Sequence, residues 1–479
     1  MKPSWTPSKY QKAIFKDIKE NSGHLIVEAR AGSGKTTSLI ESFRHVPRGK
    51  KIIALAFNKI IADELKERSP SYVVARTFHS WGLQAIKQRF KTVQIDEYKT
   101  SNIVKTLVED EDDYDLIGNI CDAVDYCKYG LQDTPTQIEE LIRRFGIDTC
   151  DLDMRDFISL VIKTLGLCKT DTSKVDFNDM CWMSFVLNLP FEKFDFVFVD
   201  EFQDCNRSQL IIAKRTLAPN GRLIAFGDDF QSLYSWRNAD TTVMAEVRSQ
   251  STTKTLSLPI SYRCPKKVIE IAQRWVPDIT CPDTAIDGEI NDINYEALFT
   301  KAKPGCFVLS RTNAPLIKVA MRFIREGKPA NIRGRDIGKS LSYLIKKSKK
   351  KRMDAFLTWL EKWRDDEVAS LAAKKINPEN VLDRYECLLN LCEEHKTLDE
   401  VLKQIDAMFT DKTEKELIIL STVHRAKGLE RNDVFMLRWT FQIWLDESVQ
   451  LIEKPNENCN IAYVCASRCA KRLFIVNKF

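Results

Sequence analysis

The chain has 479 residues, of which 44% are hydrophobic and 29% charged, a composition typical of folded globular proteins rather than disordered ones. Its length suits about three domains. There is no apolar run of about eighteen residues and no apolar signal core at the N-terminus, so we expect an intracellular, soluble protein without a membrane partner. The net charge of +6 permits nucleic acid binding without requiring it.

The fourteen cysteines are scattered and form no C-x-x-C pair, which favours reduced thiols over disulfides. Cys459, Cys465 and Cys469 have the look of a metal site. Because Cys465 and Cys469 are one helical turn apart in an apolar stretch, core packing is the favoured interpretation.

The N-terminal segment predicts a helix that begins near Pro7 and is capped by Thr6 or Ser8. Gln11 lies on its first turns. An amide side chain offers one donor and one acceptor, which is what the edge of adenine requires. Most glutamines in such places are simply exposed, and that alternative stays open.

Residues 24–37 predict a buried strand over 25–27, a tight loop over 29–34 and a helix from Thr36. The stretch follows the G-x-x-x-x-G-K-[ST] pattern except that Ala29 replaces the first glycine. Backbone N–H groups of such a loop cradle a polyphosphate. Lys35 would neutralise the outer phosphates and the Thr36 hydroxyl would hold Mg²⁺. The predicted nucleotide-binding residues are Ala31, Gly32, Ser33, Gly34, Lys35, Thr36 and Thr37.

Two further strands, over 51–57 and 72–77, end in aromatic and hydrogen-bonding side chains. Asn58 and a helix over 59–68 follow the first, and residues 77–82 follow the second. Such side chains suit a single strand of nucleic acid, which needs faces for its bases and donors for its phosphates. Ordinary loop residues that cover the core are the alternative.

The strand predicted over 194–199 delivers Asp200 and Glu201 to its C-terminal end, where ligands bind in open α/β sheets. Asp200 is expected to bind Mg²⁺, and Glu201 to accept a proton from the water that attacks the γ-phosphate. Gln231 follows the strand at 222–226 and is expected to sense that phosphate. Tyr234 and Trp236 lie further out, as base-stacking residues or as core aromatics.

Several segments resemble, in order, the motifs of superfamily 1A helicases of the UvrD, Rep and PcrA type. They are residues 31–36, 77–80, 200–204, 227–237, 261–263, 310–313, 421–430 and 460–468. The sequences of the last two segments resemble most the F-box DNA helicase branch. The matches run from Gln11 to Arg468, so the resemblance covers the whole chain.

The resemblance implies roles for residues that their patterns alone do not assign. Tyr262 would stack on adenine beside Gln11, and Glu430 would reach the ribose. Arg263 and Arg468 match two arginine fingers, whose guanidinium groups stabilise charge on the transferred phosphoryl group. The residues that match family contacts to single-stranded DNA are Phe57, Asn58, Thr77, His79, Tyr234, Trp236, Arg311, Asn313, Thr422 and His424.

The implied fold is α/β, with two RecA-like P-loop NTPase domains whose parallel sheets are flanked by helices, each with a helical insertion. We expect the first core (1A) over 1–82 and 175–255, with insertion 1B over 83–174. The second core (2A) is expected over 256–339 and 413–479, with a short insertion 2B over 340–412. A basic run at 346–352 would contact duplex phosphates, serve as a localisation signal or form a solvated helix face.

The expected function is an ATP- and Mg²⁺-dependent DNA helicase that acts as a monomer and moves 3′ to 5′ on single-stranded DNA. Its expected substrates include junctions of single- and double-stranded DNA, in replication, recombination or repair, with proteins of those processes as candidate partners. Two alternatives remain: an RNA-directed motor with the same ATPase, and a nucleic-acid clamp or scaffold subunit without productive unwinding.

Overall fold

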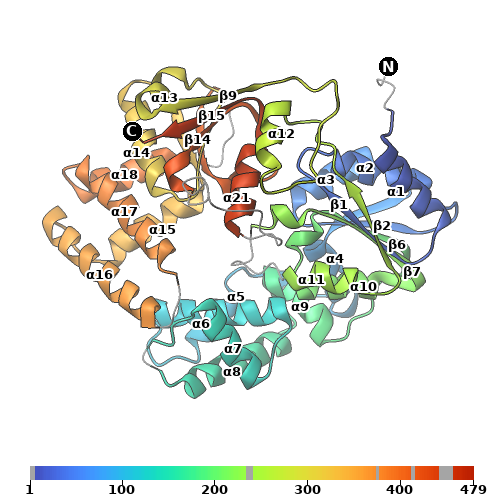
Figure 1. Ribbon diagram of the computed structural model, residues 1–479. Helices are drawn as coiled ribbons and strands as arrows, with labels where there is room; N and C mark the ends of the chain where they lie inside the picture. Colours follow the sequence, from blue (N-terminus) through green and yellow to red (C-terminus); the bar gives the residue numbers. More distant parts are fainter. Residues whose placement is uncertain are drawn as a thin grey trace. The chain divides into compact units, whose positions relative to one another are not determined.

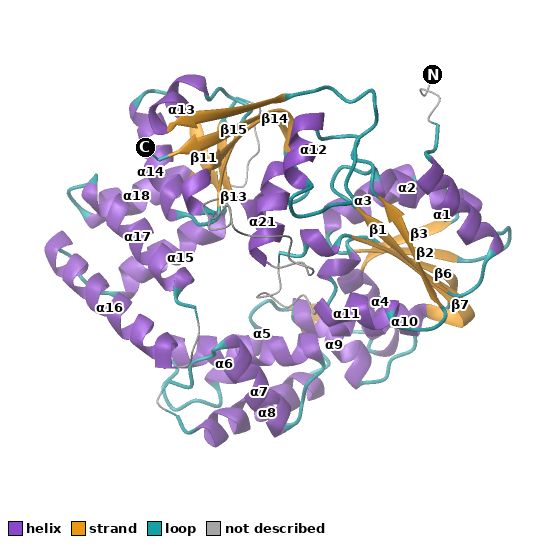
Figure 2. Cartoon of the chain, viewed as in Figure 1, coloured by secondary structure: helices purple, strands orange, loops and turns teal. Residues whose placement is uncertain are grey.

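The computed structural model describes residues 6–150, 152–233, 241–373, 377–410, 416–441 and 457–478. The chain divides into two compact units. The first comprises Met1–Ala29 and Gly34–Leu258, and the second comprises Arg30–Ser33 and Pro259–Phe479. Each unit is built on a parallel β-sheet with helices packed around it (Figures 1 and 2).

The sheet of the first unit has six strands in the order β3-β2-β6-β7-β1-β8, and every adjacent pair is parallel. Its strands are β1 (His24–Ala29), β2 (Ile52–Ala56), β3 (Val73–Thr77), β6 (Phe194–Val199), β7 (Leu217–Gly227) and β8 (Thr253–Leu258). All five residues of β2 are buried, as expected for a strand covered on both faces. The predicted α/β class is confirmed.

Helices α1 (Lys9–Glu20), α2 (Lys35–Ser42), α3 (Lys59–Arg68), α10 (Arg207–Thr216) and α11 (Thr241–Arg248) accompany this sheet. Ser8 caps α1, one of the two predicted caps, and it does so in a reciprocal capping box with Gln11. At the other end of α1, the buried Arg222 of β7 donates to the carbonyls of Asp17 and Asn21 and pairs with the Asp17 carboxylate. The Asp17 carbonyl also accepts from the N–H of Asn21, the C-cap of α1, so Arg222 adds a second donor there and supplies one to the carbonyl that follows the helix.

Residues 83–174 are mostly helical, as predicted. The elements after β3 are α4 (Phe78–Arg89), β4 (Gln94–Ile95), α5 (Lys99–Lys105), α6 (Tyr114–Gly130), α7 (Pro135–Phe145), α8 (Met154–Thr170), β5 (Lys174–Val175) and α9 (Phe177–Val186). Helix α4 begins at Phe78, earlier than the sequence indicated, because Thr77 caps it and Trp81 is buried and donates to the Thr216 hydroxyl.

A fully buried ion network joins α5 and α6 to α9. The ammonium of Lys128 lies 2.9 Å from Asp176 and 2.8 Å from Asp179, and Lys99 lies 2.7 Å from Asp179. Burial by itself would lower the pKa of Lys128, but the two carboxylates outweigh it and raise that pKa. Lys128 therefore keeps its charge inside an apolar core.

We expect Lys128→Met to lower the free energy of unfolding by about 3 kcal/mol, because it leaves the buried Asp176 carboxylate without its ion-pair partner and Asp179 with Lys99 alone. Lys163→Met, on the exposed side of α8, is the matched control and should change that free energy by less than about 0.5 kcal/mol. Urea unfolding of the two variants provides the measurement. Equal stabilities would show that the network contributes nothing to the fold.

The sheet of the second unit has seven strands in the order β12-β11-β13-β10-β14-β15-β9, again all parallel. They are β9 (Glu289–Asn294), β10 (Phe307–Ser310), β11 (Ala330–Arg333), β12 (Phe409–Thr410), β13 (Ile418–Thr422), β14 (Arg431–Leu437) and β15 (Cys469–Asn477). Its helices are α12 (Lys266–Ala272), α13 (Tyr295–Lys301), α14 (Ala314–Arg325), α15 (Arg335–Lys347), α16 (Met353–Ala373), α17 (Glu379–Glu393), α18 (Leu398–Met408), α19 (Val423–Ala426) and α21 (Glu457–Ala466).

Helices α16, α17 and α18 share one hydrophobic core with the sheet of this unit. Phe356, Leu388 and Ile405 belong to the same buried cluster as Phe323 of α14 and Leu420 of β13. The boundaries drawn in sequence between cores and insertions stay predictions.

The three cysteines that resembled a metal site are buried, Cys459 and Cys465 in α21 and Cys469 at the start of β15. Within the described ranges, no three histidine, cysteine or acidic side chains gather as metal ligands. Across the same residues, no helix combines the length and apolarity needed to span a membrane.

Candidate nucleotide and nucleic-acid site

The end of the phosphate loop in the first unit is Gly34, the N-cap of α2. Its φ of +73° is a left-handed conformation that glycine adopts without strain. Lys35 is the first residue of the helix, Thr36 is half-buried after it, and the Thr37 hydroxyl accepts from Arg68. Backbone N–H groups at such a helix start attract anions.

Gln11 lies beside this loop, but its amide is engaged within the protein. Its oxygen accepts from the N–H of Ser8 at 2.8 Å, and its nitrogen donates to the Ser38 hydroxyl at 2.9 Å. The side chain is buried, contrary to the simple exposed alternative. Contact with adenine would require Gln11 to exchange one of these partners, and that role stays a prediction.

Lys35 meets the two carboxylates that follow β6. Its Nζ lies 3.3 Å from Asp200 Oδ1 and also pairs with Glu201 Oε1. Burial opposes the charge on Lys35, but the negative charges of Asp200 and Glu201 outweigh it, and the pKa of Lys35 is raised. The structure thus brings together three of the predicted catalytic and metal-binding side chains.

Ala31, Gly32 and Ser33 group with the second unit. There the N–H of Ala31 donates to the Tyr463 hydroxyl at 2.8 Å, and the carbonyl of Gly32 accepts from the N–H of Tyr262 at 2.8 Å. Ser33 is buried. A phosphate oxygen that used the Ala31 N–H would take the place of the tyrosine hydroxyl.

Gln231 lies in the short helix η3 (Asp229–Gln231), after β7. Its amide nitrogen donates to Asp228 Oδ2 at 2.7 Å. The N–H of Asp228 donates in turn to Gln203 Oε1 at 3.0 Å, and Gln203 Nε2 donates to Glu201 Oε2 at 2.6 Å. Glu201 itself has a φ of +52°, unusual for a residue with a side chain. Gln203 and Asp228 thus link two predicted catalytic residues.

In the second unit, three of the residues assigned by resemblance lie close together. Arg263 pairs with Glu430 and donates to the carbonyl of Ser467 at 3.4 Å. Arg468, the next residue, is 1% exposed and its guanidinium donates to the carbonyls of Val464 and Leu429. Tyr262 is 53% exposed. Both guanidinium groups already donate hydrogen bonds within the protein. To contact a phosphate, each arginine would have to give up one of these bonds.

The described residues that match DNA contacts in the first unit lie at neighbouring strand ends, as predicted, because Ala56 of β2 is in register with Thr77 of β3. Phe57 is half-buried, and Asn58 and Thr77 cap α3 and α4 with their side-chain oxygens. His79 lies on the first turn of α4, where burial lowers its pKa. Tyr234 and Trp236 lie outside the described residues.

The matching residues of the second unit also share one sheet edge, since Ser310 of β10 is in register with Thr422 of β13. Arg311 forms a two-point ion pair with Glu379 of α17, at 2.7 and 3.0 Å. Thr422 precedes α19, and His424 lies within it.

Asp383, one turn further along α17, accepts from the N–H groups of Asn313 and Ala314 and from the Asn313 amide. It therefore supplies the N-terminal cap of α14 from another helix.

Sequence reasoning missed Gln203, Asp228, Glu379 and Asp383. The first two lie inside motifs that were quoted for the resemblance, so a hydrogen-bonding residue beside a catalytic one was the available signal. Nothing in the sequence around Glu379 and Asp383 indicates their partners, which lie about 70 positions earlier in the chain.

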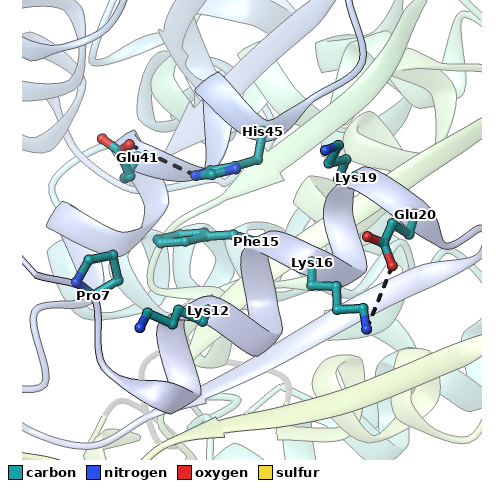
Figure 3. Close-up of a pocket in the computed structure, with 8 residues that line it drawn as sticks. All are labelled: Pro7, Lys12, Phe15, Lys16, Lys19, Glu20, Glu41 and His45. Carbon is teal, nitrogen blue, oxygen red and sulfur yellow. Dashed lines mark ion pairs between the residues drawn. The ribbon is translucent and has the colours of Figure 1, made fainter.

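A separate hollow of about 400 Å³ lies beside α1. Figure 3 shows Phe15 stacked on His45, at 4.5 Å between ring centres, with Lys12, Lys16 and Lys19 around them. None of the predicted site residues lines this hollow.

A glycine-rich loop that leads into a helix, with an acidic pair at the end of a strand of the same parallel sheet, defines a P-loop nucleotide-binding protein. Residues 10–252 match the UvrD/REP helicase N-terminal domain, and residues 335–478 match the UvrD-like helicase C-terminal domain. The chain belongs to the UvrD/REP helicase family. The resemblance seen in the sequence motifs is confirmed, while the nearness to the F-box branch stays a prediction.

Curated relatives agree with this assignment. The chain is 27% identical over 282 residues to the ATP-dependent DNA helicase Rep of Escherichia coli strain K12. The aligned region covers 52% of this chain and 41% of the relative. It is 25% identical over 297 residues to the ATP-dependent DNA helicase PcrA of Bacillus subtilis strain 168, covering 54% and 38%. The chain thus spans less than half of the length of these relatives.

Proposed function

We propose that this protein is an ATP-dependent motor that moves along single-stranded DNA in the 3′-to-5′ direction and unwinds duplex DNA. The observation that carries the proposal is the Lys35, Asp200 and Glu201 cluster at the phosphate loop of a chain that matches both helicase domains. The relatives' printed names, ATP-dependent DNA helicases, support the substrate and the reaction.

The residues present fit a nucleotide with Mg²⁺. Asp200 and Thr36 offer the hard oxygen ligands that Mg²⁺ prefers, and the bound ion would neutralise charge on the phosphates. Lys35 would leave the two carboxylates and bind the outer phosphates, which frees Glu201 to accept the proton of the attacking water. Gln231 would contact the γ-phosphate, while Arg263 and Arg468 would stabilise its transition state.

Strand displacement tests activity and polarity together. Duplexes with a 3′ or a 5′ single-stranded tail are mixed with the protein, ATP and Mg²⁺, and release of the labelled strand is followed. We expect release from the 3′-tailed duplex only. Release from the 5′-tailed duplex alone would reverse the polarity, and ATP hydrolysis without release from either would leave a translocase.

DNA and RNA oligonucleotides of equal sequence separate the proposal from an RNA-directed motor, because a 2′-hydroxyl changes both the contacts and the shape of the sugar. We expect DNA to stimulate ATP hydrolysis more strongly. Binding of either strand without any hydrolysis would favour a clamp subunit instead.

A further inference from the structure

A continuous chain of hydrogen bonds joins Glu201 to Gln231 through two residues to which no role has been assigned. Gln203 donates to Glu201 Oε2 at 2.6 Å and accepts from the N–H of Asp228 at 3.0 Å. Asp228 Oδ2 then accepts from Gln231 Nε2 at 2.7 Å. We call these four residues the relay. Gln203 is 4% exposed and Asp228 is fully buried, so the middle of the relay is shielded from water, whereas Glu201 and Gln231 at its two ends are half-buried.

The orientation of the Gln203 amide is determined by its partners, which are the Glu201 carboxylate, the Asp204 carboxylate at 3.4 Å and the N–H of Asp228. A carboxylate accepts only, and a backbone N–H donates only, so the amide nitrogen must face Glu201 and the oxygen must face Asp228. The neighbouring backbone also restricts it. A Cβ at Gly227 would lie 2.8 Å from Gln203 Oε1, so only glycine leaves the amide in this place. Both its hydrogen-bond partners and the neighbouring backbone therefore hold the Gln203 amide in one orientation.

We propose that Gln203 is a positioning residue that ties the orientation of Glu201 to that of Gln231. The inference rests on the proposed function, in which Glu201 is the base and Gln231 contacts the γ-phosphate. A phosphate that draws Gln231 toward itself pulls on Asp228, and the rigid amide of Gln203 transmits that displacement to the carboxylate. The base is then aligned when the phosphate is present, which limits hydrolysis to productive complexes.

The test compares DNA-stimulated ATP hydrolysis in variants that cut the relay at different bonds. Gln203→Met removes both relay bonds of the amide, together with its longer bond to Asp204, whereas Gln203→Glu keeps the acceptor for Asp228 and places a second carboxylate against Glu201. Gly227→Ala displaces the amide without altering it. We expect each to lower kcat about 10- to 100-fold with KM for ATP changed by less than about threefold.

The control is Gln209→Met. Gln209 is 2% exposed and its Oε1 accepts from the N–H of Asn206 at 3.0 Å, in a capping box of α10 outside the relay. It should reduce thermal stability and leave kcat near the wild-type value. If Gln203→Met behaves like Gln209→Met, with kcat unchanged at a temperature where both are folded, the inference is wrong.

A double-mutant cycle with Gln231→Ala tests the transmission itself. Residues that act as one unit give a double variant hardly worse than the worse single variant, whereas independent residues give factors that multiply. Multiplying factors would overturn the relay. Failure of the proposed function would give a different result. The wild-type protein itself would then show no DNA-stimulated ATP hydrolysis for Lys35→Ala to abolish.

Discussion

Replacement of Lys35 by alanine is expected to lower kcat for DNA-stimulated ATP hydrolysis by about 10³-fold, since it removes a charge aimed at the phosphate oxygens. DNA binding should remain measurable, because none of the predicted DNA contacts involves this side chain. Steady-state hydrolysis and fluorescence anisotropy of a labelled oligonucleotide provide the two measurements. Near-normal turnover in this variant would remove the assignment of the phosphate loop.

Lys35→Ala is also expected to change how the stability of the protein depends on pH, which is an effect separate from the loss of turnover. Without the ammonium, Asp200 and Glu201 repel each other, and the pKa of Asp200, already raised by burial, rises further. A carboxyl group whose folded pKa lies above its unfolded value of about 3.9 loses stability as the pH rises through the folded value. The stability deficit of Lys35→Ala should therefore be smaller at about pH 5 than at about pH 8.

Lys35→Ala combined with Glu201→Gln provides the control, because the second change removes one of the two repelling charges. Thermal unfolding of the double variant should be closer to that of the wild type, while its turnover stays low because it also lacks the proposed base. If Lys35→Ala itself regains wild-type turnover at a temperature where it is shown to be folded, its loss arose from unfolding and not from the chemistry.

Local patterns were enough to predict most elements of the first sheet. Strands β1, β2 and β6 are buried apolar runs that break into small or charged residues, and helix α3 was predicted at its observed bounds, 59–68. Such segments carry their own start and stop signals, so neighbouring structure does not override them. The start of α4 was predicted less well, because the cap at Thr77 resembles a loop until the burial of Trp81 is known.

Contacts between distant segments could not be predicted in this way. The carboxylates of α17 that hold Arg311 and Asn313 lie about 70 residues away in the chain, and a single sequence does not indicate which acidic side chain folds back. The same applies to Arg468, whose role came from resemblance and whose burial came from the structure. Motifs indicate the chemistry of this site, whereas packing decides how each side chain is held before a ligand binds.

Arg468→Ala is expected to lower turnover by at least about 10³-fold, the effect of removing a guanidinium that stabilises the transferred phosphoryl group. Arg468→Lys should restore little, since an ammonium cannot reproduce bonds to the Val464 and Leu429 carbonyls and a phosphate from one planar group. Loss of the buried donors should also lower the free energy of unfolding by about 1–3 kcal/mol. Single-turnover hydrolysis and urea unfolding provide the measurements.

Arg472→Ala is the matched control, four residues further along in β15. Arg472 forms an exposed ion pair with Asp433, at 2.7 Å, and pairs of this kind contribute at most about 1 kcal/mol. Its turnover and stability should both remain near those of the wild type. If Arg468→Ala is as active as Arg472→Ala once both are folded, Arg468 supports the backbone around residues 460–468 and another group stabilises the transition state.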